Sequence, residues 1–421
     1  MQASCLIAVD SSAKLWNGVP IQAKNLGYWL LQKITPSSAG FPSKPDMSVG
    51  ERLKMILKLL TIFPVSLALN ILRMLVLSVV HGMKLRPSLL AAVVRTTFGI
   101  LTGKEIQKLQ PTTRQEYAKF IKYAAKRWSA PNFKNRVVYD VQELNKGVDD
   151  SAILWLGDRK KAKKVVLFLH GGGYVLPASD GHFLWAWNAY VMSGVEAGVE
   201  TAVAFLQYTL APRGVLPGPL RQTVAAYEEV RAQGFQARDV VVGGDSAGGN
   251  LTMQFLGHAL HPQPTVTELK LSEPLAGAFL VSAWLGQSDD TESFRTFGNN
   301  DMVSTAIIQK LGPESIDPHK HATVRFESDP WSRPLEADFG WFQGFEAITP
   351  KLYITYGGRE VLRDHSLAMI ETIKREAPAV NLLTYEAPKE LHDGVLLEHI
   401  FKKPDHNAKK MKTWFKSVII E

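Results

Sequence analysis

The pattern of hydrophobic positions divides the chain into two regions. From about residue 134 onward, short runs rich in Val, Ile, Leu and Phe alternate with longer stretches of helical periodicity. Continuous apolar runs of this kind are typical of strands buried on both faces of a parallel sheet. The pattern predicts an α/β doubly wound fold. The expected strands cover residues 136–141, 152–156, 165–170, 200–207, 240–243, 276–281, 351–356 and 380–385.

The preceding region has a different pattern. Residues 1–50 contain scattered Ser, Pro and Gly and predict loops with short helices, whereas residues 51–130 have helical periodicity. We therefore expect an N-terminal region over residues 1–130 and an α/β domain over residues 131–421.

Residues 53–83 form the most apolar segment of the chain. The stretch 59–72 carries no charge, Arg73 interrupts the run, and basic residues flank both ends. A spanning helix needs about 20 apolar residues, and flanking cations are typical of spanning or interfacial segments. Two interpretations stay open: contact with a membrane, or an apolar helix that packs on the domain as a substrate cap.

Composition excludes several protein classes. The chain has 421 residues, of which 46% are hydrophobic and 21% charged, so it is neither disordered nor collagen-like. A single cysteine, Cys5, excludes a disulfide framework and a cysteine-based zinc site. The net charge of +8 is scattered along the chain, and we expect no nucleic-acid partner. Residues 1–17 lack the apolar core of a signal peptide, which predicts an intracellular protein, cytoplasmic or attached to the endoplasmic reticulum membrane.

The sequence GGDSAGG at residues 243–249 carries the strongest chemical signal. It follows an expected strand and precedes a helical stretch, which is the context that a G-x-S-x-G nucleophile turn requires. Such a turn is tight enough to need small residues around Ser246, and it lifts the serine oxygen clear of the sheet. The first amides of the following helix, beginning at Ala247, point at any anion that develops there.

A second glycine-rich segment, HGGGY at residues 170–174, follows the strand expected at 165–170. Consecutive glycines let the backbone approach a substrate and direct N–H groups toward it, as the tetrahedral oxyanion of acyl transfer requires. We predict that Gly172, Gly173 and Ala247 supply these amides, and that His170 supports the loop without acting as a base.

Together the two motifs resemble the hormone-sensitive-lipase-like branch of the α/β-hydrolases (the α/β-hydrolase-3 group). The segments QYTLAP (207–212), VSAWL (281–285), GREVLRD (358–364) and LHDG (391–394) are similar to further family motifs. Three features depart from the family pattern: Glu360 stands in place of aspartate, Arg221 and Gln222 replace a usual acidic residue, and the N-terminal region is long and apolar. The general character of the sequence resembles that of fungal steryl-acetyl-hydrolase-like proteins and of hydrolases from biosynthetic clusters.

The resemblance implies an α/β-hydrolase fold with a mostly parallel sheet, flanking helices and a helical cap. It also implies the chain order serine, acid, histidine. Only His392 follows a late strand in a loop ending with glycine, so it is the expected general base. Two carboxylates, Glu360 and Asp364, follow the strand at 351–356. The family motif places its catalytic acid at the position of Glu360, and Asp364 falls where a helix begins.

The predicted function is cofactor-free and metal-free hydrolysis of a hydrophobic carboxylic ester, such as an acetylated lipid, sterol or secondary metabolite. Ser246 would attack the carbonyl carbon and form an acyl-enzyme. The insertion at residues 287–345 and the N-terminal helices would cap the site, and Trp185 and Trp187 would lie near it. Condensation, cyclisation or amide hydrolysis of a secondary-metabolite intermediate would use the same residues and remains an alternative. A non-catalytic scaffold is disfavoured by the intact motifs.

Overall fold

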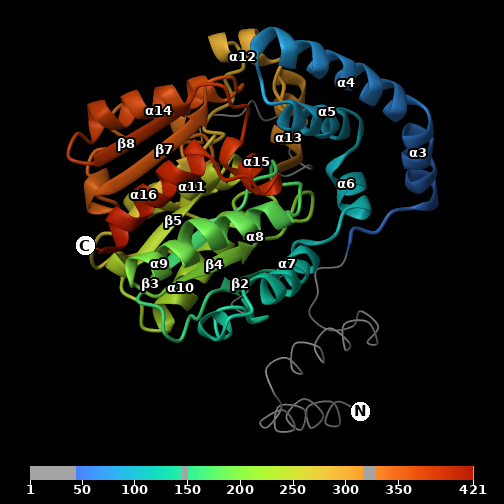
Figure 1. Ribbon diagram of the computed structural model, residues 1–421. Coiled ribbons are helices and arrows are strands. Elements are labelled where there is room, and N and C mark those ends of the chain that lie inside the picture. The colour runs from blue at the N-terminus through green and yellow to red at the C-terminus, as the bar shows by residue number, and fades with distance from the viewer. Residues whose placement is uncertain (1–43, 145–149, 316–328, 421) are drawn as a thin grey trace, which may run out of the picture.

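The computed structural model describes residues 44–144, 150–315 and 329–420. Figure 1 shows a central sheet with helices on both faces and a group of N-terminal helices beside and above it. The helices are α3 (Val49–Leu60), α4 (Ile62–His81), α5 (Leu85–Ile100), α6 (Gly103–Leu109), α7 (Thr113–Arg127), α8 (Asp180–Ala186), α9 (Met192–Ala197), α10 (Gly218–Ala232), α11 (Ala247–Leu260), α12 (Glu292–Phe297), α13 (Thr305–Ser315), α14 (Arg363–Glu376), α15 (Gly394–Ile400) and α16 (His406–Ile420).

The sheet contains eight strands in the order β1-β2-β4-β3-β5-β6-β7-β8. Strands β3 to β8 pair in parallel, whereas β2 is antiparallel to both of its neighbours. The expected α/β fold with a mostly parallel sheet is therefore confirmed. The strands are β1 (Val141–Glu143), β2 (Ala152–Leu156), β3 (Lys164–Leu169), β4 (Thr201–Gln207), β5 (Val240–Asp245), β6 (Gly277–Val281), β7 (Lys351–Gly357) and β8 (Asn381–Ala387).

The strand expected at residues 136–141 is wrong, because only residues 141–143 join the sheet there. Two backbone bonds still join this segment to β2, from the Trp155 N–H to the Asp140 carbonyl at 3.0 Å and from the Gly157 N–H to the Arg136 carbonyl at 3.2 Å, and a side chain of α7 occupies part of the ladder. The Tyr117 hydroxyl accepts from the Asp140 N–H at 3.1 Å and donates to the Trp155 carbonyl at 2.6 Å. Backbone groups that a neighbouring strand would have paired are thus satisfied by a tyrosine.

Each face of the sheet has its own core. Side chains of α10, α11 and α14 pack on one face, and those of α7, α8 and α16 pack on the other. The expectation that Trp185 and Trp187 lie near the site is corrected here. Both indoles are fully buried in the second core, where Trp185 Nε1 lies 3.1 Å from Met411 Sδ.

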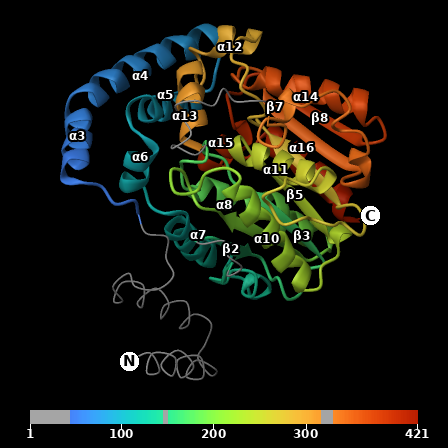
Figure 2. The same ribbon diagram turned by 180° about the vertical axis from the view of Figure 1, so that it is seen from behind.

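Helices α5 and α6 and the described parts of the insertion, residues 287–315 and 329–345, cover the carboxyl edge of the sheet, as the capped fold predicts (Figures 1 and 2). From α6, the Gln107 amide donates to the carbonyls of Val175 and Ala211 at 2.9 and 2.7 Å. From α5, Arg95 donates to the Asp301 carbonyl in the insertion at 3.0 Å. The cap is therefore bonded directly to loops that surround the site.

Helices α3 and α4 lie outside this cap, on the far side of α5 (Figure 1). Residues Val49–His81 are long and apolar enough to cross a membrane by length and composition, and only 6% of the most apolar window is buried. Because so little is buried, this segment differs from the core helix of a globular domain. The loops expected before residue 44 lie outside the described residues.

Candidate active site

The nucleophile turn joins β5 to α11 as expected. Ser246 is the N-cap of α11 and has φ 49° and ψ −115°, a backbone conformation that non-glycine residues rarely adopt. Its N–H donates to the Val281 carbonyl at 2.8 Å, and its carbonyl accepts from the Trp284 N–H at 3.1 Å. These bonds to the end of β6 hold the strained residue in place.

The glycines around Ser246 are required by a close approach of backbone. A Cβ atom added to Gly244 or Gly248 would collide with the carbonyl oxygen of Leu169, the last residue of β3. The nucleophile turn and the start of the HGGG loop therefore touch directly. This contact positions the two motifs against each other.

The HGGG loop adopts the conformation that its glycines permit. Gly172 and Gly173 have φ values of +103° and +60°. A Cβ on Gly173 would lie 2.6 Å from the Leu311 methyl of α13, so the cap packs closely over this loop. The loop supplies two of the three residues predicted to bind the oxyanion, and Ala247, at the first position of α11, is the third.

His170 lies beneath the loop, fully buried. Its ring stacks on Tyr208 with centroids 4.4 Å apart, and Nδ1 donates to the Gly171 carbonyl at 2.8 Å. Burial lowers the pKa of His170 to about 3, so it stays neutral and occupied by structural contacts. This geometry agrees with a supporting role.

His392 lies beside the nucleophile, at the carboxyl end of β8. Its Nε2 is 2.9 Å from Ser246 Oγ, the distance at which a general base accepts the hydroxyl proton. Burial lowers the pKa of His392 to about 4, partly opposed by the charge of Asp245. The imidazole is therefore neutral near pH 7, which is the form that can accept a proton.

Of the two candidate acids, Glu360 is the one near His392. Its Oε2 is 4.0 Å from His392 Nδ1, and it accepts from Ser282 Oγ at 2.6 Å and from the Gly357 N–H at 3.0 Å. Burial raises the pKa of Glu360 well above its ordinary value. His392 Nδ1 has no hydrogen-bond partner among the described residues, so the contact with the acid is open in this state.

Asp364 faces a different part of the molecule. Its Oδ2 accepts from the Ser293 N–H at 2.8 Å, and its Oδ1 pairs with Arg363 Nε at 3.0 Å. The first contact links α14 to the insertion, and the second lies within the first turn of α14. The geometry thus favours Glu360 over Asp364 as the partner of His392.

Three further polar residues at the site were not predicted from the sequence. Ser282 accepts from the Asp393 N–H at 3.1 Å while donating to Glu360, so it links the acid loop to the histidine loop. Asp393 Oδ2 lies 3.3 Å from His392 Nε2, and burial raises the pKa of this carboxyl well above its ordinary value. Adjacency to His392 in the chain was the one available signal for Asp393.

The third of these residues is Asp301, a fully buried carboxyl from the cap insertion. Its Oδ1 accepts from the His392 N–H at 3.1 Å and its Oδ2 from the Val361 N–H at 2.9 Å. Asp301 therefore holds the backbone of Val361, the neighbour of Glu360, and the backbone of His392 at the same time. Burial raises the pKa of Asp301 to about 6 despite these bonds.

We expect Asp301→Asn to lower kcat by roughly 10- to 100-fold with little change in KM, because an amide cannot accept at both oxygen positions and His392 would shift. Kinetics over a pH series provide the measurement. The wild-type enzyme should lose activity as Asp301 protonates below about pH 6, and the variant should lack that step. Asp290→Asn, at an exposed carboxylate of the same insertion, is the control. A variant that keeps both kcat and the step near pH 6 would contradict this role.

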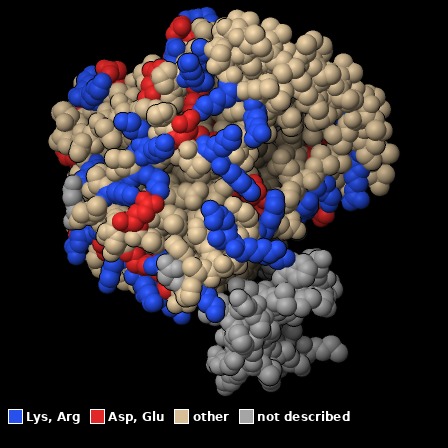
Figure 3. Space-filling view, in the orientation of Figure 1, with Lys and Arg blue, Asp and Glu red and all other residues tan. Residues whose placement is uncertain are grey.

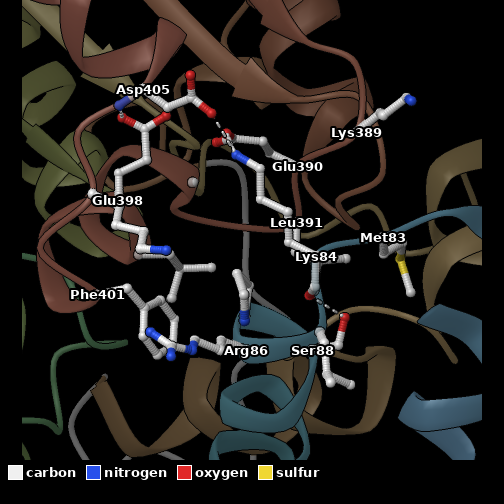
Figure 4. A pocket seen from close by; sticks show the side chains of 15 residues that line it. Met83, Lys84, Arg86, Ser88, Lys389, Glu390, Leu391, Glu398, Phe401 and Asp405 are labelled. Atoms are coloured by element: carbon white, nitrogen blue, oxygen red, sulfur yellow. Dashed lines mark hydrogen bonds and ion pairs between the residues drawn. The ribbon is translucent and has the colours of Figure 1, made fainter.

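A groove of about 450 Å³ opens beside the histidine loop (Figure 4). Leu391 and Gly394, on either side of the His392–Asp393 pair, line it, but Ser246 and the HGGG loop do not. Lys84, Arg86, Lys389 and Lys403 contribute the basic part of its lining. The groove therefore adjoins the candidate catalytic residues without containing Ser246.

Among the described residues, no group of three or more His, Cys, Asp or Glu side chains could hold a metal ion.

Comparison with known proteins agrees with this geometry. A family model described as the alpha/beta hydrolase fold matches residues 166–394, which is more than half of the chain. A Schizosaccharomyces pombe protein named as a steryl acetyl hydrolase is 24% identical over 64% of this chain and 68% of its own length. An acetyl-hydrolase of Streptomyces hygroscopicus is 26% identical over 51% of this chain and 63% of its own length. The chain thus spans about two thirds of the length of these relatives.

Solved structures show the same fold. An esterase/lipase from an uncultured bacterium aligns with a TM-score of 0.52 at 23% identity, covering 78% of this chain and 96% of its own. Carboxyl esterase 2 of the fungus Tuber melanosporum aligns with a TM-score of 0.53 at 19% identity, covering 66% of this chain and 87% of its own.

Proposed function

The chain belongs to the α/β-hydrolase fold family and is a hydrolase of the carboxylesterase and lipase type, and from this premise we propose that it cleaves hydrophobic carboxylic esters through an acyl-enzyme on Ser246. The observation that carries the proposal is the 2.9 Å contact between Ser246 Oγ and His392 Nε2. A neutral, buried imidazole at that distance is what a serine hydroxyl needs to become nucleophilic.

The reaction proceeds in two halves. In the first, Ser246 Oγ attacks the ester carbonyl carbon while His392 Nε2 takes the hydroxyl proton, and the amides of Gly172, Gly173 and Ala247 bind the oxyanion. Collapse of this intermediate breaks the bond to the alcohol oxygen, which leaves with the proton from His392. In the second half, His392 takes a proton from water, the hydroxide attacks the acyl carbon, and the acid leaves as Ser246 regains its proton.

Two observations support a hydrophobic substrate. The cap over the carboxyl edge of the sheet contributes apolar side chains, including Leu311 against Gly173. In addition, two of the relatives are named for removing acetyl groups, one of them from sterols. We therefore infer a small acyl group on a large apolar alcohol, such as an acetylated lipid, sterol or secondary metabolite.

The test measures release of acid from a series of p-nitrophenyl esters of increasing acyl length and from an acetylated sterol. We expect the highest kcat/KM for acetyl and other short acyl groups. Labelling of the protein by a fluorophosphonate should abolish turnover, because the probe occupies the serine oxygen. Absence of hydrolysis across the series, or turnover that survives complete labelling, would contradict the proposal.

A further inference from the structure

The outer face of α3 and α4 is an exposed apolar surface. It is formed by large side chains that are 47 to 85% exposed, namely Val49, Leu53, Ile56, Leu57, Leu60, Ile62, Val65, Leu69, Leu72, Val76, Val79 and Val80. Figure 3 shows this region at the upper right as a broad area without charged side chains. Isolated apolar residues are common on protein surfaces, but a continuous patch over two helices indicates an interaction site.

The inner side of the same helices is fixed to the body of the protein. Met74 and Ser78 are buried, and the Asn70 amide donates to Thr96 Oγ1 of α5 at 2.9 Å. Ion pairs flank α4 on both sides. Before it, Lys58 in the last turn of α3 bonds Glu105 at 2.8 Å, and after it, Lys84 bonds Asp405 at 2.9 Å. The helices therefore present one apolar side outward while their other side is occupied.

The charges around the outer face have one dominant sign. Residues 49–81 contain four Lys or Arg residues and one acidic residue, Glu51, which is paired with Lys104. Arg52 and Lys54 are exposed at the beginning of α3. Beyond the end of α4, the groove is lined by the exposed Lys84, Arg86, Lys389 and Lys403 and by three acidic residues, Glu390, Glu398 and Asp405. Lys84 is paired with Glu390 and Asp405, so Arg86, Lys389 and Lys403 are the cations that this end of the apolar surface offers to lipid headgroups.

We propose that the outer face of α3 and α4 docks on an anionic lipid bilayer, with α4 lying in the plane of the membrane. An apolar side bounded by cations is the arrangement with which interfacial helices bind, since the side chains enter the acyl region while the cations meet lipid headgroups. A spanning orientation is disfavoured because Arg73 lies in the middle of α4 and because α4 would lose its contacts with α5. This surface is independent of the catalytic residues.

Docking in this orientation would bring the groove to the membrane surface. The groove is lined by Met83, Leu85 and Leu391, directly after the end of α4 and directly before His392. An ester dissolved in the bilayer would thus meet an apolar groove beside the active site. This consequence rests on the proposed function, whereas the docking does not.

The test is flotation of the full-length protein with vesicles of phosphatidylcholine and phosphatidylserine in a roughly 7:3 ratio. Wild-type protein should float with these vesicles, and less with pure phosphatidylcholine. The variant Val65→Glu/Leu72→Glu/Val79→Glu, whose changes recur every seven residues on one side of α4, should bind at least about tenfold more weakly. The matched control is Phe339→Glu/Leu383→Glu/Ile420→Glu, which changes three other exposed apolar residues outside α3 and α4 and should bind like wild type.

The alternatives give different results. Failure of the wild-type protein to float, or equal binding by the first variant, would overturn the proposal. A dimer in solution that this variant converts to a monomer would assign the face to a second copy of the chain. Binding that appears only after removal of residues 1–43 would assign it to that segment. Turnover of a water-soluble short ester should be the same in both variants, so a missing hydrolase activity would leave the flotation result interpretable.

Orientation is tested in a Cys5→Ser background, since the chain has no other cysteine. Lys54→Cys and Arg86→Cys place thiols before and after the apolar surface. When protein is added to preformed vesicles, a membrane-impermeant maleimide should label both positions from outside. Protection of either thiol until the vesicles are lysed would overturn the in-plane orientation.

Discussion

Replacing Ser246 with alanine is expected to lower kcat by about four to six orders of magnitude while leaving the protein folded. The change removes the atom that forms the acyl-enzyme, and neither His392 nor the oxyanion amides can replace it. The backbone bonds from Ser246 to Val281 and Trp284 involve main-chain atoms only, so alanine preserves them. Turnover of a p-nitrophenyl ester and the melting temperature are the two measurements.

A control separates the chemistry from the strain of the turn. Ser246→Ala keeps a Cβ atom on a residue with φ 49°, so the melting temperature of this variant reports any contribution of the hydroxyl to stability. Ser282→Ala is a matched change at another residue of positive φ, 46°, and only its melting temperature serves as the control, because its hydroxyl bonds Glu360. Near-normal esterase turnover in purified Ser246→Ala would refute the mechanism.

The parts of the molecule that could be predicted from sequence are those defined by local patterns. Buried strands such as β2 and β5 appear as continuous apolar runs, and the turn at Ser246 needs glycines that the sequence displays. His392 was identified by its place after the last strand. In each case the information lies within about ten residues of the feature.

The parts that could not be predicted depend on contacts between distant segments. Asp301 belongs to the cap insertion, and nothing nearby in the chain shows that its carboxyl bonds the backbone of His392. Similarly, Tyr117 of α7 supports residues 138–140, which otherwise have the periodicity of a strand. Buried aromatic residues after the HGGG loop were ambiguous because a core and a pocket have the same side-chain pattern.

The two interpretations of the apolar N-terminal segment also depended on tertiary structure. Hydrophobicity alone does not distinguish a helix that covers a site from one that faces a membrane. In the structure α5 and α6 bond to the loops of the site, whereas α4 lies outside them and carries the surface that we propose meets a membrane. The cap and the proposed docking surface are therefore two layers of one region.

The second large effect concerns the acid of the triad. Glu360→Gln is expected to lower kcat by about 10³ to 10⁴, because the carboxylate stabilises the imidazolium that forms when His392 takes the proton. Asp364→Asn should leave kcat nearly unchanged and cost about 1 kcal/mol of stability, since it weakens the bonds to Ser293 and Arg363. Kinetics and melting temperatures of the two variants, both of which replace an acid by its amide, make the comparison.

From this geometry we expect Glu360 to act mainly in the transition state. In the resting protein its Oε2 bonds Ser282 and Gly357 and stays 4.0 Å from His392 Nδ1, while burial raises its pKa. A positive charge on His392 reverses this balance, because it favours the ionised carboxylate and draws the two groups together. Glu360→Asp keeps the charge on a shorter side chain and should therefore retain more activity than Glu360→Gln. If Asp364→Asn abolishes turnover while Glu360→Gln is nearly silent, the two carboxylates have been assigned the wrong way round.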